Sequence, residues 1–369
     1  MVSAYAPGRI ELLGNHTDYN EGYSLGFAVN MGVTAQGQAR DDETVNLHIE
    51  GSGDENFSIK AITKNPRAPW ADVCKGVLDQ MVKAGAPLRG IDVTVTNPMP
   101  EDAALGANAA TEVALVLFLQ KAFGFEFGDM NDPTVRMGIA SACKTAENDF
   151  LGTNVSIFDP AVSMMGKKDH VALLDFRNES AELLPLHPDL CFVLCHPGVR
   201  SMMLSSKFSA RRSECAEAVK LLIMNKINVK ALRDIKSEDV RLNAGLFVPR
   251  VFARAMHVTT ENERTLMARD AILNNDIETL GKLMYESQES SREAFENSTP
   301  FLDQLVAIAK EQPSCVGARL TGGGFAGCTL SMVYRSEAEA FSAELTRQYR
   351  EKSGKEPKAW IVEASEGAA

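Results

Sequence analysis

The sequence predicts an α+β protein with two lobes, the first over residues 1–185 and the second over residues 186–369. The chain has 369 residues, a length typical of about two domains. Segments with strand periodicity prevail in the first half and segments with helical periodicity in the second, but each half contains both kinds. Pro185 and Pro188 interrupt the regular pattern, which places the expected boundary near 180–190.

In the first half, alternating apolar residues predict strands, and apolar residues at helical spacing predict helices. We expect strands at 44–49, 57–59, 90–97 and 171–176, and helices at 71–84, 107–123 and 135–148. The polar run Gly51–Asn56 predicts a turn between the first two of these strands. The helix at 107–123 is largely apolar, so we expect it to be buried, and Gly124 to end it.

The second half is dominated by helical patterns. Strands are expected at 190–195, 330–333 and 360–362, and helices at 203–224, 231–236, 258–274, 276–295, 301–311 and 336–349.

The composition excludes several classes of protein. Hydrophobic residues make up 45% of the chain and charged residues 24%, as in ordinary globular proteins. The net charge of −11 argues against broad binding to nucleic acid or to an anionic membrane, but not against binding one nucleotide. No apolar run approaches the roughly 18 residues of a membrane span, and the N-terminus has no signal-peptide core.

The seven cysteines are scattered and are expected to be buried, reduced thiols. We therefore expect a cytoplasmic protein without nucleic-acid or membrane partners. The sequence shows no coiled-coil pattern and no distinctive apolar patch, so we expect a monomer or a weak oligomer.

The segment Ala6–Asn20 concentrates polar groups around a short apolar strand. Two turn signals bracket that strand, and charged or hydrogen-bonding side chains crowd both ends: Arg9 at one end, and Asn15, His16 and Asp18 at the other. A pocket for a polyhydroxylated ligand needs such groups, because each hydroxyl requires a donor and an acceptor. A polar turn between two strands is the alternative.

A loop of small residues, 98–106, opens the long helix at 107–123. Such a loop suits a phosphate bound at the helix N-terminus, where free N–H groups and the helix dipole favour anions. It is not a P-loop, because no Gly-Lys-Ser/Thr follows. Packing of the small residues against a neighbouring helix is the alternative.

Two later stretches also suggest chemistry. Asp159 follows two apolar residues and precedes an apolar helix, so it is either a candidate base or a helix cap with Pro160 at the first helical position. The three glycines 322–324 can form either an anion-binding nest or a plain tight turn.

These four stretches together, in this order and spacing, resemble the galactokinases of the GHMP small-molecule kinase superfamily. Ala-Pro-Gly-Arg at 6–9, followed by Gly-x-His-Thr-Asp-Tyr-Asn at 14–20, is close to the sugar-binding signature of that family. Thr-Gly-Gly-Gly-Phe-x-Gly-Cys at 321–328 is close to its C-terminal glycine motif. The resemblance implies a two-lobed GHMP kinase fold, with a ribosomal-S5-like N-terminal lobe, a ferredoxin-like C-terminal lobe and an active site in the cleft between them.

The resemblance also implies roles for individual residues. Arg9 and Asp159 match the catalytic pair of the family. The positions expected at the sugar are Asn15, His16, Asp18, Ser156 and Phe208. The positions expected to bind ATP are Trp70, Leu105, Gly106, Ala107, Asn108, Ala109, Gly323 and Gly324, and those expected at Mg²⁺ are Asn108 and Glu147.

At several of these positions the chain departs from the family pattern. Asn15 stands where the family usually has glutamate, near the expected sugar 6-hydroxyl, and Asn108 replaces the serine hydroxyl that would meet Mg²⁺. Ser156 replaces a glycine, Pro160 a glutamine and Phe208 a tyrosine.

The implied activity is the ATP- and Mg²⁺-dependent phosphorylation of the anomeric C1 hydroxyl of galactose. Asp159 would accept or orient the hydroxyl proton, while Arg9 would keep Asp159 ionised and stabilise the transferring phosphoryl group. Two alternatives remain: a catalytically weak or inactive relative that binds sugar and ATP as a regulator, and a GHMP kinase for an amino sugar or another alcohol.

Overall fold

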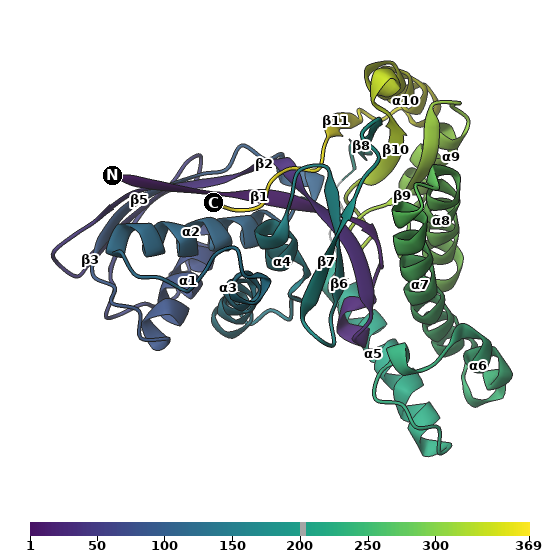
Figure 1. Cartoon of the computed structure of the whole chain (residues 1–369), viewed down its shortest axis with the longest axis horizontal. Helices are drawn as coiled ribbons and strands as arrows, with labels where there is room; N and C mark the ends of the chain where they lie inside the picture. The colour runs from purple at the N-terminus through teal and green to yellow at the C-terminus, as the bar shows by residue number, and fades with distance from the viewer. Residues whose placement is uncertain (200–203) are drawn as a thin grey trace.

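Seven strands form the sheet of the first lobe, which occupies the left and centre of Figure 1. Their order is β4-β3-β5-β2-β6-β7, with β1 paired to β2, and all neighbours are antiparallel except β3 and β5. The computed structural model describes residues 1–199 and 204–369. The strands are β1 (Val2–Leu13), β2 (Tyr23–Ala39), β3 (Thr44–Ile49), β4 (Gly53–Ser58), β5 (Ile91–Thr96), β6 (His170–Asp175) and β7 (Ser180–Pro185).

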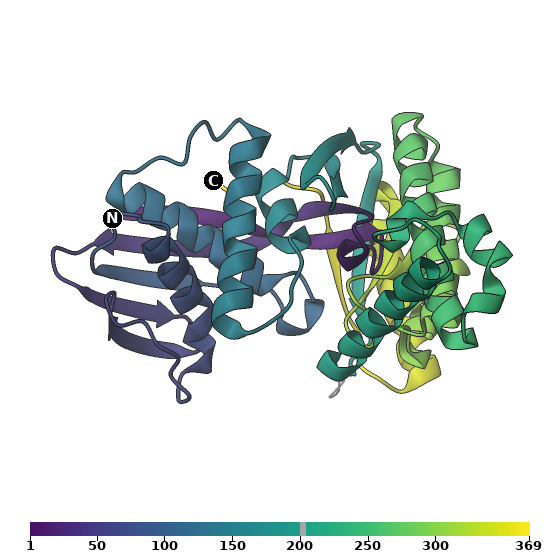
Figure 2. The ribbon, with the colours of Figure 1, turned by 90° about the horizontal axis from the view of Figure 1, so that it is seen from below.

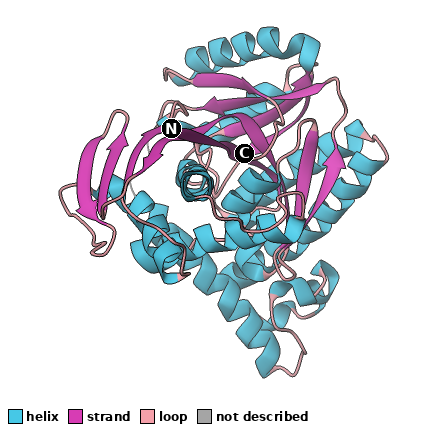
Figure 3. Ribbon diagram, turned by 60° about the vertical axis from the view of Figure 1, so that its left-hand side comes forward, coloured by secondary structure: helices cyan, strands magenta, loops and turns pink. Residues whose placement is uncertain are grey.

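Helices cover one face of this sheet (Figures 1 and 3). They are α1 (Asp72–Lys83), α2 (Ala107–Phe123), α3 (Pro133–Ala146) and α4 (Phe158–Met165), with the short turns η1 (Asp18–Asn20), η2 (Pro69–Ala71), η3 (Glu101–Ala103) and η4 (Glu147–Leu151) between elements. The apolar helix α2 is buried along most of its length against β1 and β2, and Gly124 ends it with a φ of 67°. Its predicted bounds and burial are confirmed.

The second lobe has a four-stranded sheet of order β11-β8-β10-β9, on the right of Figures 1 and 2. Its strands are β8 (Leu190–His196), β9 (Cys315–Leu320), β10 (Thr329–Tyr334) and β11 (Lys358–Val362), and its helices are α5 (Leu204–Met224), α6 (Ser237–Leu242), α7 (Pro249–Leu273), α8 (Ile277–Ser290), α9 (Pro300–Lys310) and α10 (Ala338–Ser353). The turns η5 (Leu232–Asp234), η6 (Ala244–Leu246), η7 (Ser291–Phe295) and η8 (Arg335–Glu337) connect them. This arrangement confirms the predicted α+β class.

After β11 the chain returns to the first lobe. Val29 forms a bridge with Ala364, Ser365 N donates to Ala28 O at 2.8 Å, and Ala369 N donates to Tyr5 O at 3.0 Å. The large sheet ends at Pro185 and the small sheet begins at Leu190. The lobe boundary at 185/186 stays a prediction. The last residues of the chain, although they belong to the second half of the sequence, pack on the first lobe.

A shift in the register of β1 against β2 prepares the site. Pro7 pairs with Gly32 and Arg9 with Ala28, so β2 carries the extra residues and Gly8 lies opposite them. A Cβ on Gly8 would lie 2.8 Å from Leu105 O, and Arg9 N donates to that same oxygen at 2.8 Å. Only glycine lets the loop before α2 approach β1 this closely.

Several sequence-based expectations differ from the structure. The run Gly51–Asn56 is a turn only at its start, because β4 begins at Gly53. The helix expected at 231–236 is the single turn η5, and α7 begins nine residues earlier than expected, at Pro249 instead of 258. Residue 203, the first of a predicted helix, lies outside the described residues. No prediction covered β7, β9 or most of β2.

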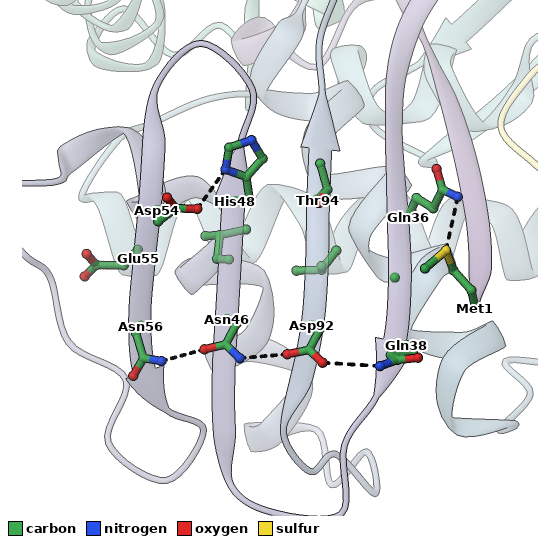
Figure 4. A pocket seen from close by; sticks show the side chains of 13 residues that line it. Met1, Gln36, Gln38, Asn46, His48, Asp54, Glu55, Asn56, Asp92 and Thr94 are labelled. Atoms are coloured by element: carbon green, nitrogen blue, oxygen red, sulfur yellow. Dashed lines mark hydrogen bonds and ion pairs between the residues drawn. The ribbon is translucent and has the colours of Figure 1, made fainter.

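The outer face of the large sheet carries a shallow hollow of about 740 Å³ (Figure 4). Its polar side chains bond to one another across the strands: Asn56 donates to Asn46, Asn46 donates to Asp92 at 2.7 Å, and Gln38 donates to Asp92 at 3.4 Å. The groups that carry the predicted chemistry lie elsewhere. Among the described residues, no helix is long and apolar enough to cross a membrane.

Candidate active site between the lobes

A cavity of about 360 Å³ lies where the two lobes meet. Residues of both lobes line it: Arg9, Glu11, Asn15, His16, Asp18, Tyr19, Ser24, Asn154, Val155, Ser156, Phe158 and Asp159 from the first, and Phe208, Arg212, Gly322 and Gly323 from the second. They include the predicted catalytic pair and every predicted sugar-binding residue. The remaining predicted site residues, namely Trp70, residues 105–109, Glu147 and Gly324, are not part of this lining.

Arg9 and Asp159 form a two-pronged ion pair at the cavity wall. Arg9 Nε donates to Asp159 Oδ1 at 2.6 Å, and Arg9 Nη2 donates to Asp159 Oδ2 at 2.5 Å. The Asp159 side chain remains 33% exposed, so a ligand can reach it. Asp159 is not a helix cap, because α4 begins at Phe158 with Ile157 as its N-cap and no side-chain cap bond. Planar, charge-assisted pairs of this kind fix both groups in one orientation.

The Asn15 and His16 side chains are already engaged by the protein. Asn15 is fully buried, donates from Nδ2 to Gly322 O at 2.7 Å, and accepts at Oδ1 from Asn297 Nδ2 at 2.7 Å. His16 Nε2 faces Gly323 O at 3.0 Å, and its Nδ1 lies 3.1 Å from the Tyr19 hydroxyl. A carbonyl only accepts, so Nε2 carries the proton. Burial lowers the pKa of His16 to about 3, which keeps the ring neutral.

Asp18 presents an acceptor that no other described residue uses. It lies in the short turn η1 and lines the cavity. Within 1–199 and 204–369, no side chain or backbone group donates to its carboxylate. Of the three polar residues predicted to bind sugar in this turn, Asp18 is the one whose side chain is open to hydroxyl groups without rearrangement. Its role stays a prediction.

Helix α7 of the second lobe holds the turn that carries Asn15. The buried carboxylate of Glu261 accepts from Gly14 N at 3.0 Å, Asn15 N at 3.3 Å and Ser287 Oγ at 2.7 Å. His257 Nε2 donates to Asn15 O at 3.1 Å. Burial alone would raise the pKa of Glu261, but Arg264 and other charged neighbours hold it below its usual range.

Sequence reasoning missed both α7 residues, Glu261 and His257. The available signal was the presence of polar residues on the buried face of an amphipathic helix.

Phe208 and the triple-glycine loop close the cavity from the second lobe. The Phe208 ring lies 5.5 Å from the His16 ring and 5.7 Å from the Phe325 ring. A Cβ on Gly323 would lie 2.0 Å from Phe208, and one on Gly324 would lie 2.3 Å from Asn297 O. The loop therefore needs glycines at these two positions to pack against Phe208 and Asn297. Nucleotide binding by Gly323 and Gly324 stays a prediction.

Ser156 also lines the cavity, on the side of α4. Its hydroxyl accepts from Phe158 N at 3.3 Å. The hydroxyl thus helps to shape the first turn of α4, and its contact with sugar stays a prediction.

The loop before α2 lies directly beside the ion pair. A Cβ on Gly106 would lie 3.2 Å from Asp159 Oδ2, and Arg9 Nη1 donates to Ala104 O at 2.7 Å. Gly106 has a φ of 73° and no side chain caps the first turn of α2, so the backbone N–H groups at 107–109 are available to an anion. Trp70 lies in η2, where its ring is 3.5 Å from the Cβ position of Gly53.

A second group of carboxyl side chains lies near the start of α2. Asn108 Nδ2 donates to Glu147 Oε1 at 3.3 Å. Both carboxylate oxygens of buried Glu112 lack a hydrogen-bond partner. Burial, followed by the charge of Glu147, raises the pKa of Glu112 to about 10, and burial also raises the pKa of Glu147. In the described part of the chain, no three His, Cys, Asp or Glu side chains are arranged to hold a metal ion.

The free energy of unfolding of Glu112→Gln, compared with that of the wild type, is expected to increase as the pH rises. An unfolded glutamate has a pKa of about 4.3, so between that value and the folded one the native chain holds a proton that the unfolded chain has lost. The stabilisation from this proton is complete below the unfolded pKa and is lost as the pH rises, by at most about 1.4 kcal/mol per pH unit. Glutamine removes this dependence.

Urea unfolding at acidic, neutral and alkaline pH measures this effect. The free energy of unfolding of Glu112→Gln, minus that of the wild type, should grow from the acidic to the alkaline measurement. Glu126→Gln, at an exposed loop position, serves as the control and should follow the wild type. A difference that stays constant with pH would contradict the prediction.

Comparisons with known proteins agree with this geometry. Family models match at residues 2–39 (galactokinase galactose-binding signature), 72–167 (GHMP kinases N-terminal domain) and 268–351 (GHMP kinases C-terminal). Galactokinases from Chloroflexus aurantiacus and Roseiflexus sp. are 32% and 34% identical to this chain, each over 99% of the chain and 92% of the relative.

Solved structures give the same picture. The galactokinase of Lactococcus lactis, in a complex with galactose, superposes with a TM-score of 0.92 at 26% identity, covering 100% of this chain and 94% of that one. A mevalonate kinase from Methanococcus jannaschii shares the fold, with a TM-score of 0.69 at 15% identity over 99% of this chain and 98% of that one.

Proposed function

Since the chain belongs to the galactokinase family of the GHMP kinases, we propose that it transfers the γ-phosphoryl group of ATP to the C1 hydroxyl of galactose. One observation carries this proposal: the Arg9–Asp159 ion pair faces the same cavity as Asp18 and lies beside the uncapped start of α2. A cavity of this kind holds an acceptor for a sugar hydroxyl next to a place for phosphates.

The chemistry follows from the positions of these groups. A sugar in the cavity with C1 toward α4 places its hydroxyl at the exposed edge of Asp159, which accepts or orients the proton. Arg9 fixes that carboxylate and stabilises negative oxygens on the transferring phosphoryl group. The N–H groups at the start of α2 bind the phosphates of ATP and align them with the sugar.

The residues near the start of α2 fit Mg²⁺. Glu147 and Asn108 would supply the carboxylate and amide oxygens that this ion prefers. Bound there, Mg²⁺ would neutralise charge on the phosphates. Trp70 is the residue we assign to the adenine.

Asn108→Ser is expected to improve the use of Mg·ATP. In the present chain the Asn108 amide is bonded to Glu147, and serine would free that carboxylate while adding a hydroxyl ligand. The apparent KM for Mg·ATP and the Mg²⁺ concentration at half-maximal rate should both fall several-fold. Asn131→Ser, in an exposed loop, should change neither. An unaltered Mg²⁺ titration in Asn108→Ser would discredit Asn108 as a ligand position.

Galactose-dependent ADP formation tests the function itself. ADP release from Mg·ATP should require galactose and should be absent with 1-deoxygalactose, which lacks the acceptor hydroxyl. Sugar binding measured by calorimetry, without any turnover across a panel of aldoses and amino sugars, would instead favour a regulator.

The same proposal includes a cytoplasmic location and a monomeric or weakly associated state. All seven cysteines are free and six are buried, which is compatible with a reducing compartment.

A further inference from the structure

We infer that Glu11 determines sugar specificity, with one carboxylate oxygen accepting a hydrogen bond from a hydroxyl on the side of the sugar ring opposite the reacting C1. Sequence patterns assigned no role to this residue. The inference rests on the proposed function, because it concerns how the same cavity recognises its sugar.

The two oxygens of the Glu11 carboxylate have different environments. Asn15 Nδ2 donates to Oε1 at 3.1 Å, and Arg319 Nη1 donates to the same oxygen at 3.2 Å. No group of the residues described here donates to Oε2. The Glu11 side chain is 12% exposed and lines the cavity. One oxygen is thus anchored by the protein, while the other is left for a donor that enters the cavity.

Asn15 cannot supply that acceptor. Its side chain is fully buried, and its Oδ1 already accepts from Asn297. Its Nδ2 is shared between Glu11 and Gly322 O. Asn15 stands where the family usually has glutamate, so an ionised acceptor is missing at this position. In this fold a carboxylate is present beside that position, at Glu11, and Asn15 holds it in place.

The register of β1 places Glu11 across the ring from the reacting centre. Arg9, Ile10 and Glu11 pair in order with Ala28, Phe27 and Gly26, without a bulge among them. Side chains two residues apart on a strand leave the same face about 6.6 Å from each other. With C1 held at Arg9 and Asp159, Glu11 lies beyond reach of the neighbouring 2-hydroxyl and meets the 3-, 4- or 6-hydroxyl.

Arg319 makes a charged acceptor sustainable at this place. Its side chain is fully buried, and its Nη1 also donates to Leu12 O at 3.0 Å. Burial is the largest effect on Glu11 and raises the pKa of its carboxyl, and the nearby Asp18 and Glu261 act in the same direction. The charge of Arg319 and the hydrogen bond from Asn15 lower that pKa and so favour the charged acceptor. A buried acceptor of this kind strongly disfavours a sugar that lacks the matching hydroxyl.

The test combines two variants with a set of deoxygalactoses. Glu11→Gln removes the charge but keeps the shape, and Glu11→Asp keeps a charge for Arg319 but withdraws the carboxylate from the cavity. We expect each to lower kcat/KM for galactose by about 10- to 100-fold, mainly through KM. With one of 3-, 4- or 6-deoxygalactose, the variants should equal the wild type within about threefold, because that analogue has no hydroxyl for Glu11 to bind. With 2-deoxygalactose the full loss should remain.

Glu43→Gln, which changes an exposed carboxylate paired with Lys60 far from the cavity, is the matched control and should behave as wild type with every sugar. An equal loss with all analogues in both variants would show a purely structural role and overturn the inference, as would no loss at all. A loss that disappears only with 2-deoxygalactose would overturn the placement.

The outcome also separates this inference from the proposed function. Absence of galactose-dependent ADP formation in the wild-type protein would contradict the proposed function and not, by itself, the role of Glu11. The same wild-type and variant proteins are then titrated calorimetrically with galactose and each deoxygalactose, and the same pattern of losses in affinity supports or overturns the inference.

Discussion

Asp159→Asn is expected to lower kcat by about 10²- to 10⁴-fold while the affinity for galactose changes only a few-fold. The asparagine amide keeps the shape of the carboxylate and can still bond to Arg9, but it cannot accept the proton of the C1 hydroxyl. Initial rates of ADP formation measure kcat, and calorimetric titration with galactose measures affinity. Unchanged turnover would remove Asp159 from the mechanism.

Asp175→Asn provides a matched control. Asp175 forms a comparable two-pronged ion pair with Arg233, at 2.5 and 2.8 Å, on the large sheet and outside the cavity. Both residues of that pair are mostly buried, as Arg9 is. Its replacement should lower the thermal midpoint without altering kcat. The comparison separates loss of an ion pair from loss of a catalytic group.

Asp18→Ala is expected to reduce kcat/KM for galactose by at least about 10²-fold, which corresponds to about 3 kcal/mol. The carboxylate faces the cavity and has no hydrogen-bond partner among the described residues, so it can accept from two sugar hydroxyls at once. In the variant both hydroxyls would lose this acceptor. Epimers that differ at those hydroxyls should lose less, since they bind Asp18 less well in the wild type.

A neighbouring carboxylate provides the comparison for this variant. Glu21 follows the same turn but lies outside the cavity and pairs with Arg177 at 2.6 Å on the surface. Glu21→Ala should cost at most about 1 kcal/mol of stability and leave galactose kinetics unchanged. Equal kinetics in Asp18→Ala and Glu21→Ala would contradict the assignment of Asp18 to the sugar.

Local pattern predicted the elements whose burial is uniform. Helix α2 was found with its bounds because an unbroken apolar run is followed by Gly124, which adopts the left-handed conformation that ends helices. Strand β9 escaped detection because Gly317 and Arg319 interrupt its apolar pattern, yet both are buried, the glycine against α8 and the arginine beside Glu11. Strand β4 looked like a turn because it is an edge strand with polar residues.

The site was predictable only in part. No local pattern brings Arg9 to Asp159, which are 150 residues apart, and their pairing followed from a resemblance to known sequences. The resemblance also directed attention to Asn15 and away from Glu11, although the structure gives the open acceptor to Glu11. The periodicity of α7 can mark Glu261 as a polar residue on a buried face, but it cannot give the turn at Gly14 as its partner, because the two elements meet only in the folded chain.

The NMR spectrum of the product formed from Mg·ATP and galactose tests most directly whether this cavity phosphorylates the C1 hydroxyl. If Arg9 and Asp159 act on the C1 hydroxyl, the phosphorus resonance of the product couples to the anomeric proton, and one sugar phosphate forms for each ADP. Phosphate attached at another hydroxyl, or ADP formed without any sugar ester, would contradict the assignment of this cavity to phosphoryl transfer at C1.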